Sequence, residues 1–448
     1  MSEMNLKQYD IAVIGSGPGG FSAAVRAAQL GAKVCLIEKD LTGGTCLNSG
    51  CIPTKFLWQA LKTKQKIQKS YDYGFKATLE PFSFADIIDK KDKSISNIRK
   101  GMEMILSSYG VETIKGKASF KSPHCLLVEN GADNIEVNAG KIIIASGAAP
   151  SEIRGLEFDG EKIVNSTDIL NLREIPKKIL IVGGGAIGIE IASILAGFGS
   201  SVTLAEKESQ LLPGEDIEIS EEVKKNLQRQ SIEVLTSCND AFDLEEDFDK
   251  TLVVTGRKPV NDLSLENAGL TLTEKGFIKT DEYCVTNVEN IYAAGDISGK
   301  YMLAYTAQNE GSISAENAIL GNKIKVDNSV VPAAVFSNPP AASVKVKNFS
   351  CNDEGISFGK FPFTASGRAF IENERTGFVK CAVEKNSGKP LAFWIVGAHA
   401  DEMINTAAVI LKSGTISRES MFHPSLSEGL FNAYEDALGK CTEIMKRK

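Results

Sequence analysis

The feature that most restricts the fold of this chain is a glycine-rich unit that occurs twice. In the first copy, an apolar run at 10–14 leads into Gly15, Gly17 and Gly20, and an alanine-rich stretch and a second apolar run at 33–37 follow. Glu38 comes directly after that run. A strand, a G-x-G-x-x-G turn, a helix and a strand that ends in an acid form a dinucleotide fingerprint. The glycines admit a pyrophosphate to the helix N-terminus, and Glu38 is placed to accept hydrogen bonds from ribose hydroxyls.

The second copy repeats this order at one common offset. Gly183, Gly185 and Gly188 lie 168 residues after the first three glycines, and Glu206 lies 168 residues after Glu38. Each copy is also closed by an apolar strand that ends at a glycine, at Gly147 and at Gly256. We therefore predict two dinucleotide sites.

A pair of cysteines stands just downstream of the first fingerprint, in the segment GGTCLNSGCIPTK at 43–55. Four residues separate Cys46 from Cys51, so one distorted helical turn brings the two sulfurs within reach of a disulfide. A helix predicted from residue 56 to about residue 69 points its N-terminus at both cysteines, which favours the reactive thiolate. Two inert buried cysteines remain an alternative. Half of a zinc site is another, although no further ligands stand nearby at zinc-binding spacing, and we predict no metal.

The position of the cysteines distinguishes the two dinucleotide sites. The first fingerprint adjoins the cysteines and is the natural FAD site, so the second is expected to bind the nicotinamide cofactor. Glu206 favours NAD over NADP because a carboxylate repels the 2′-phosphate and no arginine lies nearby in the sequence.

Composition excludes several other classes of protein. The 448 residues are 43% hydrophobic and 24% charged, and the net charge of −7 argues against nucleic acid as a main partner. The first ten residues do not resemble a secretory signal, and the apolar run at 179–198 contains three successive glycines and Glu190, so a membrane span is not expected. Nine scattered cysteines indicate a reducing, cytoplasmic setting, in which a disulfide is more often catalytic than structural.

The rest of the chain predicts a flavin-returning segment and a separate C-terminal domain. A strand at 290–298 reaches Gly295-Asp296, and a helix runs from about 302 to 320. From 331 onward, alternating apolar residues, including those at 378–382, predict antiparallel strands, with helices at 403–412 and 427–437. The range 84–109 predicts a long polar helix. The short acidic stretch between 234 and 251 indicates a trimmed second domain.

The chain closely resembles the pyridine nucleotide-disulfide oxidoreductases in four motifs. They are Cys46 and Cys51 in their glycine-rich segment, the two fingerprints, Gly295-Asp296, and the HPSLSE segment at 423–428. Leu47 and Ile52 resemble the dihydrolipoamide dehydrogenase branch most. The resemblance implies an α/β fold with two Rossmann-like dinucleotide-binding domains plus a C-terminal α+β dimerisation domain. The expected domains are 1–150 (FAD-binding, first part), 151–260 (NAD-binding), 261–330 (FAD-binding or central segment) and 331–448 (interface).

The resemblance also implies a role for each catalytic residue. Cys46 exchanges with a dithiol or disulfide substrate, and Cys51 lies against the flavin. His423 of the partner subunit is the base, and Glu428 orients it. Lys55 lies near the flavin N5 and pairs with Glu190.

The cofactor-binding residues implied by the motifs fall into two sets. The FAD set is Gly15, Gly17, Gly20, Glu38, Lys39, Gly44, Thr45, Lys55, Ala118, Gly147, Asp296 and Ala304. The NAD set is Gly183, Gly185, Ala186, Ile187, Gly188, Glu206 and Gly256.

The resulting hypothesis is a homodimeric, FAD-dependent and NAD-dependent dihydrolipoamide dehydrogenase. Its expected partners are lipoyl domains of a 2-oxoacid dehydrogenase or glycine cleavage complex, with no nucleic acid and no membrane. Another flavoprotein disulfide reductase is the first alternative, although Glu206-Lys207-Glu208 does not fit an NADPH enzyme. A low-turnover, cofactor-bound binding protein is the second. Departures from the family pattern keep both open, namely Ser49, Tyr305, Met421-Phe422 and Asn338-Pro339-Pro340.

Overall fold

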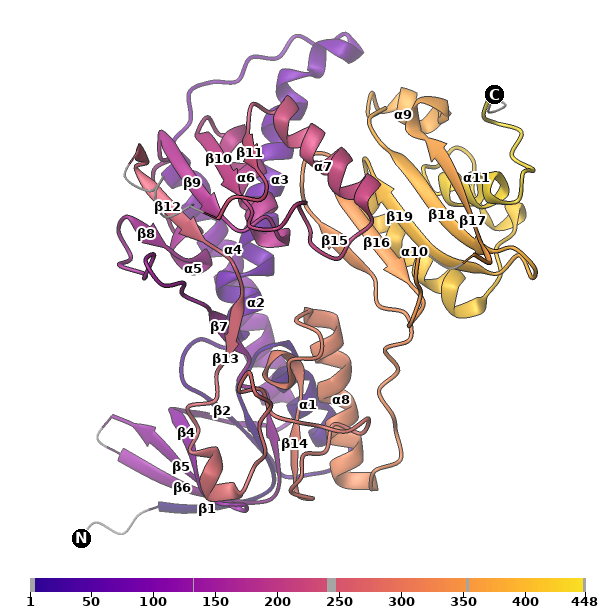
Figure 1. Ribbon diagram of the computed structural model, residues 1–448. Helices are drawn as coiled ribbons and strands as arrows, with labels where there is room; N and C mark the ends of the chain where they lie inside the picture. Colours follow the sequence, from indigo (N-terminus) through magenta and orange to yellow (C-terminus); the bar gives the residue numbers. More distant parts are fainter. Residues whose placement is uncertain (1–4, 132, 240–246, 352–353, 446–448) are drawn as a thin grey trace. The chain divides into compact units, whose positions relative to one another are not determined.

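The computed structural model describes residues 5–131, 133–239, 247–351 and 354–445 (Figure 1). The chain forms two compact units, each assembled from three stretches of sequence. The first unit comprises Met1–Phe56, Ala85–Ser151 and Gly256–Val326. The second comprises Leu57–Phe84, Glu152–Thr255 and Asp327–Lys448.

A seven-stranded sheet forms the centre of the first unit. Its parallel part runs in the order β3-β2-β1-β6, with β14 on the other side of β6, and the antiparallel strands β5 and β4 continue from β6. The strands are β1 (Asn5–Ile14), β2 (Val34–Glu38), β3 (Glu112–Lys115), β4 (Lys117–Ser122), β5 (Cys125–Asn130), β6 (Asp133–Ile144) and β14 (Ile291–Ala293). The helices of this unit are α1 (Pro18–Gln29), α2 (Gly44–Ser49), α4 (Phe84–Ser108) and α8 (Ala304–Leu320), and a two-stranded antiparallel sheet of β7 (Ala148–Pro150) and β13 (Arg257–Pro259) completes it.

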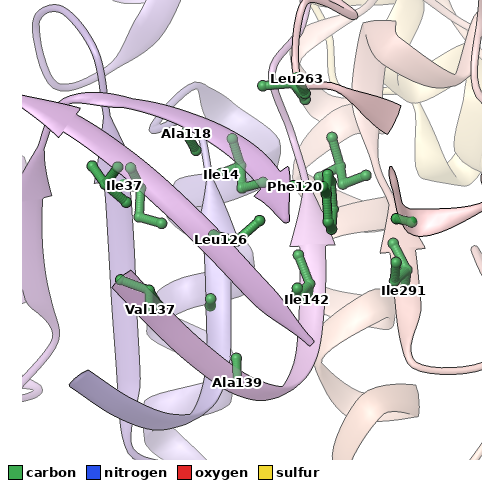
Figure 2. Packing of buried hydrophobic residues seen from close by; sticks show 14 of the residues in the cluster. Ile14, Ile37, Ala118, Phe120, Leu126, Val137, Ala139, Ile142, Leu263 and Ile291 are labelled. Carbon is green, nitrogen blue, oxygen red and sulfur yellow. The ribbon is translucent and has the colours of Figure 1, made fainter. Parts of the chain in front are cut away.

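The first strand is longer than its apolar run predicts. The sequence predicts a strand at 10–14, whereas β1 begins at Asn5 because residues 5–9 pair in parallel with residues 135–139 of β6. The cluster shown in Figure 2 fills one side of the sheet, where Ile14 and Ile37 pack with Phe120 and Leu126 of the antiparallel extension. The polar start of β1 is therefore ordered by a neighbouring strand and not by its own pattern.

The helix that follows the cysteines begins earlier than the sequence predicts. The expected start was residue 56, but α3 (Cys51–Gln68) begins at Cys51 itself. The Thr54 hydroxyl donates to the Gly50 carbonyl oxygen at 2.7 Å, and Pro53 lies in the first turn, where its missing N–H is not needed. Residues 51–56 of α3 belong to the first unit and residues 57–68 to the second.

The second unit contains a five-stranded parallel sheet in the order β11-β10-β9-β12-β8. Its strands are β8 (Ile163–Val164), β9 (Lys178–Val182), β10 (Ser201–Ala205), β11 (Glu233–Leu235) and β12 (Lys250–Val253), and its helices are α5 (Ser166–Ile169), α6 (Ala186–Gly197) and α7 (Ile217–Arg229). This sheet repeats the strand, glycine turn, helix and strand order of the first unit, as the sequence repeat requires. Of the acidic stretch between 234 and 251, residues 240–246 lie outside the described residues.

An antiparallel sheet in the order β15-β16-β19-β18-β17 also belongs to the second unit. Its strands are β15 (Ala333–Val335), β16 (Ala341–Lys345), β17 (Ile356–Pro362), β18 (Phe378–Glu384) and β19 (Pro390–Val396), with helices α9 (Gly367–Ile371), α10 (Ala400–Ser413) and α11 (Glu428–Ala437). The alternation at 378–382 predicts antiparallel strands, and β18 pairs antiparallel with β17 and β19; its first six residues are all buried. Lys380 is 8% exposed because it pairs with the acidic start of α7.

Candidate functional site

The first fingerprint forms a tight turn between β1 and α1. A Cβ on Gly15 would lie 2.4 Å from the Ala145 carbonyl oxygen, and a Cβ on Gly20 would lie 1.8 Å from the Gly15 oxygen. Gly17 is different, because a Cβ there would meet no atom of the chain within 4 Å, and its φ of −61° suits any residue. Neither packing within the chain nor backbone strain requires a glycine at this position. A ligand that approaches the main chain closely does require one, which fits the predicted pyrophosphate.

The second fingerprint has the same geometry in its own unit. A Cβ on Gly183 would lie 2.6 Å from the Val254 oxygen, and one on Gly188 would lie 1.9 Å from the Gly183 oxygen. Gly185, with φ of −79°, again has open space where a Cβ would stand. Ala186 and Ile187, the first residues of α6, are exposed beside it. Both glycine turns therefore present open main chain at a helix N-terminus, where anions bind.

The acid at the end of each second strand holds the glycine turn. One oxygen of Glu38 accepts hydrogen bonds from the Ser16 main chain at 2.8 Å and from the Ser16 hydroxyl at 2.6 Å. One oxygen of Glu206 likewise accepts from the Gly184 N–H at 2.6 Å. The other oxygen of Glu38 accepts a hydrogen bond from the Asp40 N–H, and the other oxygen of Glu206 accepts one from the Glu208 N–H, both at 2.8 Å. Contacts of these acids with ribose hydroxyls stay predictions.

Ser16 connects the first fingerprint to the cysteine segment. Its hydroxyl accepts a hydrogen bond from the Gly43 N–H at 3.1 Å, and its carbonyl oxygen accepts from the same N–H at 3.2 Å. Gly44 approaches Gly17 so closely that a Cβ on Gly44 would lie 2.7 Å from the Gly17 Cα. The cysteines are thereby placed beside the first glycine turn.

Cys46 lies inside α2, and Cys51 is the first residue of α3. Both are thiols in this structure, Cys46 half-buried and Cys51 exposed. The hydrogen bond between the two thiols raises the pKa of Cys46, and burial and the charge of Cys51 add to this, while nearby Lys55 lowers it. The sequence places both cysteines in front of a helix N-terminus that favours the thiolate, and for Cys46 this prediction is wrong.

Asp296 lies in the turn that follows β14, between Arg257 and the start of α8. Arg257 Nε is 3.9 Å from Asp296 Oδ2, and Arg257 also donates to the Ala148 carbonyl oxygen. Burial raises the pKa of Asp296, and Arg257 lowers it. The turn itself is held by Glu310, whose Oε2 accepts from the Gly295 N–H at 2.8 Å. Sequence reasoning missed both Arg257 and Glu310, because the polar sequence around Glu310 does not indicate that its carboxylate is buried.

Glu190 is 5% exposed within α6, and its Oε1 accepts from the Phe336 N–H at 3.0 Å. Glu190 belongs to the second unit and Lys55 to the first, so the predicted pair stays a prediction. At the other end of α6, Lys64 Nζ donates to the Gly197 carbonyl oxygen at 2.7 Å. Lys64 therefore supplies the positive charge that a helix C-terminus favours, and it too was not recognised in the sequence.

His423 and Glu428 lie together at the start of α11. His423 Nδ1 is 2.9 Å from Glu428 Oε1, and the other carboxylate oxygen accepts from the Ser425 N–H at 2.9 Å. The imidazole is 79% exposed, whereas the carboxylate is 25% exposed. A carboxylate at Nδ1 leaves Nε2 available to exchange a proton. The other two histidines contact Ala139 (His124) and Glu372 (His399).

The remaining predicted cofactor residues differ in what they offer a ligand. Lys39, Thr45 and Gly256 are exposed, and Ala304 is the partly exposed first residue of α8. Ala118 is 3% exposed and its side chain lies in the core of the first unit, so only its main chain is available (Figure 2). Gly147 has φ of +75°, and a Cβ there would meet nothing within 4 Å.

The whole chain is similar to known flavoenzymes. Residues 9–311 match the family described as pyridine nucleotide-disulphide oxidoreductase, and residues 331–434 match the dimerisation domain of that family. The chain belongs to the pyridine nucleotide-disulphide oxidoreductases.

Relatives in this family share the full length of the chain. A dihydrolipoyl dehydrogenase of Geobacillus stearothermophilus is 37% identical over 459 residues, and one of Bacillus subtilis is 36% identical over 467 residues, with 97% and 98% of each chain covered. Among solved structures, the Cu(II) complex of the HOCl-induced flavoprotein disulfide reductase RclA from Escherichia coli is 29% identical, with a TM-score of 0.85 over 96% of this chain and 99% of that one. LpdA from Mycobacterium tuberculosis, at 22% identity and a TM-score of 0.86 over 96% of this chain and 99% of that one, shares the fold.

Membership confirms the predicted fold class and the predicted cofactors, FAD and NAD. The chain is thus a flavoprotein oxidoreductase of the pyridine nucleotide-disulphide family, and its matched dimerisation domain supports a homodimer. Within the part of the chain that the structure describes, no helix combines the length and apolarity needed to span a membrane.

Proposed function

We propose that this protein is a dihydrolipoamide dehydrogenase that oxidises dihydrolipoamide and reduces NAD⁺. The observation that carries the proposal is the hydrogen bond between the Cys46 and Cys51 thiols beside the first glycine turn. The full length of the chain also aligns with dihydrolipoyl dehydrogenases. Glu206 supports NAD as the acceptor, since a carboxylate that follows the second strand of a dinucleotide fingerprint repels a 2′-phosphate.

Turnover begins from the disulfide form of Cys46 and Cys51. One substrate thiol loses its proton to His423 of the partner subunit and attacks Cys46 Sγ, so the S–S bond breaks and Cys51 leaves as a thiolate. The second substrate thiol then attacks the substrate sulfur of the mixed disulfide. Cys46 leaves with the proton that His423 holds, His423 takes the proton of the second thiol, and the cyclic substrate disulfide is released. Two electrons have moved from the substrate dithiol to the cysteine pair. FAD, when bound, carries these electrons onward to NAD⁺.

The other residues position and stabilise the reacting groups. Glu428 holds His423 through Nδ1 at 2.9 Å, which directs Nε2 toward the substrate thiol. Lys55 stabilises the negative charge that develops on Cys51, because a cation lowers the free energy of a nearby thiolate. Gly17 and Asp296 belong to the site of FAD, and Gly185 and Glu206 to that of NAD.

This function implies a domain plan and partners. The chain divides into an FAD domain at 1–150, an NAD domain at 151–260, a central segment at 261–330 and an interface domain at 331–448. The substrate is carried on lipoyl domains of a 2-oxoacid dehydrogenase or glycine cleavage complex, in the cytoplasm. A monomer is inactive, since Cys46 and His423 of one active site come from different subunits.

The experiment is NADH formation from free dihydrolipoamide and NAD⁺ by the purified FAD-loaded protein. We expect turnover that is lost in Cys46→Ser while FAD remains bound. Absence of NADH formation by the wild-type protein would refute the proposal.

A second candidate is a flavoprotein disulfide reductase with another substrate. The likeness to RclA at 29% identity favours it, together with Ser49 between the cysteines and Phe422 before His423. Oxidation of NADH or NADPH with glutathione disulfide, but no reaction with lipoamide, would select this candidate.

A further inference from the structure

A polar clamp holds the short helix that carries Cys46. Asn48 lies in α2 between the two cysteines, and its Nδ2 donates to the carbonyl oxygens of Leu41 at 3.3 Å, Thr42 at 3.1 Å and Gly44 at 2.9 Å. Its Oδ1 accepts from Arg99 Nε at 3.1 Å and from Arg99 Nη2 at 2.7 Å. Arg99 lies on α4, 51 residues away in the sequence and within the same unit.

The two contacts with Arg99 decide which way the amide points. Guanidinium groups only donate hydrogen bonds, so the atom that faces Arg99 is the amide oxygen, and the NH₂ group must face the three carbonyl oxygens. Leu41 and Thr42 belong to the segment that enters α2, and Gly44 is the first residue of the helix. Asn48 therefore ties α2 to the chain that precedes it, and Arg99 keeps Asn48 in the orientation that does so.

We propose that Asn48 and Arg99 are positioning residues that set the reduction potential of the Cys46–Cys51 pair. The proposal rests on the proposed redox role of this pair. A disulfide forms only when the two Cβ atoms approach to about 3.8 Å, and a clamped α2 keeps Cys46 near that geometry in the reduced form. Preorganisation favours ring closure, so the clamp stabilises the disulfide relative to the dithiol. Loss of the clamp lets Cys46 move away and makes the pair more oxidising.

The test measures the equilibrium of the pair with glutathione. Two thiols lose two electrons and two protons to glutathione disulfide, which becomes two molecules of glutathione, so the balance needs no other reactant. The FAD-loaded protein is equilibrated in glutathione buffers, quenched with acid, alkylated and analysed by mass spectrometry for Cys46 and Cys51. This readout does not depend on NAD⁺ or on turnover of lipoamide.

We expect Arg99→Met and Asn48→Ala each to reduce the equilibrium constant for disulfide formation about tenfold, which corresponds to about 30 mV. The double variant should shift no further than either single variant, because the two residues act as one unit. Lys100→Met, an exposed neighbour on α4, is the matched control and should leave the constant unchanged. Arg99→Lys keeps the charge and loses the two-pronged contact, so it should give a smaller shift and retain the fold.

An unchanged constant in Arg99→Met or Arg99→Lys, or a shift equal to that of Lys100→Met, overturns the proposal. A lower melting temperature with an unchanged constant does so as well, because it assigns the clamp to stability alone. A wild-type protein that forms no Cys46–Cys51 disulfide in any buffer would instead refute the proposed function.

Discussion

Replacement of Lys380 by methionine tests how the second unit holds a buried charge. Lys380 Nζ lies 2.8 Å from Asp216 Oδ2 and 2.6 Å from Glu218 Oε1, and these side chains are 10%, 7% and 43% exposed. Asp216 also caps α7 by accepting from the Glu218 N–H at 3.0 Å. Lys380→Met keeps the apolar stem of the side chain but leaves the buried Asp216 carboxylate without this cation.

The structure sets the size of the expected loss. Removal of one partner of a buried ion pair costs about 3–5 kcal/mol. Loss of the ion pair with Glu218 adds less than about 1 kcal/mol to this cost, because Glu218 is half exposed and keeps its contact with Lys360 Nζ at 2.7 Å. Since Asp216 stays capped to its own helix, we expect Lys380→Met to lower the free energy of unfolding of this unit by about 3 kcal/mol.

The same contacts predict a dependence on pH. Burial raises the pKa of Glu218, but Lys360 and Lys380 lower it more, to about 2. A carboxyl group with a depressed pKa stabilises the fold fully above its ordinary pKa, and this stabilisation is lost as the pH falls toward 2. We expect Lys380→Met to flatten the fall in stability between about pH 4.5 and 2.

Urea unfolding followed by tryptophan fluorescence is the assay, because both tryptophans, Trp58 and Trp394, belong to the second unit. Lys345→Met, at an exposed position of the same sheet, is the control. Asp216→Asn in the Lys380→Met background removes the unpaired negative charge of Asp216 and keeps a side chain that can cap α7. It should therefore recover about 2 kcal/mol of the free energy of unfolding. A loss no larger than that of Lys345→Met, or no recovery in the double variant, would refute the reasoning.

Two further predictions concern the cofactor sites, and a third concerns the stability of α6. Burial raises the pKa of Glu310, and its Oε2 accepts a hydrogen bond from the Gly295 N–H. We expect Glu310→Ala to weaken FAD binding about tenfold, and Glu310→Gln to weaken it far less because glutamine keeps an acceptor. FAD titration of the apoprotein measures both effects. Equal losses in the two variants would contradict this reading. Glu206→Ala should lower the preference for NAD⁺ over NADP⁺ about tenfold in kcat/KM, and an unchanged ratio would remove Glu206 as the selecting residue. Lys64→Met should lower the free energy of unfolding by about 1 kcal/mol, since it removes the cation at the C-terminus of α6. Lys76→Met, at an exposed position outside any helix, is its control in thermal melts.

Much of the site was predictable because glycine spacing acts over a short range of sequence. A G-x-G-x-x-G turn followed by an acid 23 residues after its first glycine requires a strand, a tight turn and a helix whatever surrounds it. The same holds for Glu428, which lies five residues after His423 and contacts its imidazole at 2.9 Å. The second fingerprint followed from the first by simple repetition.

Other predictions failed where distant segments determine the local structure. The apolar pattern does not predict residues 5–9 of β1, since their pairing with β6 orders them. The start of α3 moved to Cys51 because Thr54 and Gly50 close the first turn, and the pKa of Cys46 rose because Cys51 faces it. The local pattern around Lys380 also does not predict that this side chain is buried, since the start of α7 covers it.

The sequence by itself determined that this protein has two glycine turns for dinucleotides, two neighbouring cysteines and a histidine with its carboxylate, because each of these depends on residues close together in the chain. Only the tertiary structure decided that Glu310 holds Gly295, that Arg99 orients Asn48, and that Lys380 is buried against Asp216. Such contacts join residues between 15 and 164 positions apart, and their formation depends on how helices and sheets pack and not on local pattern.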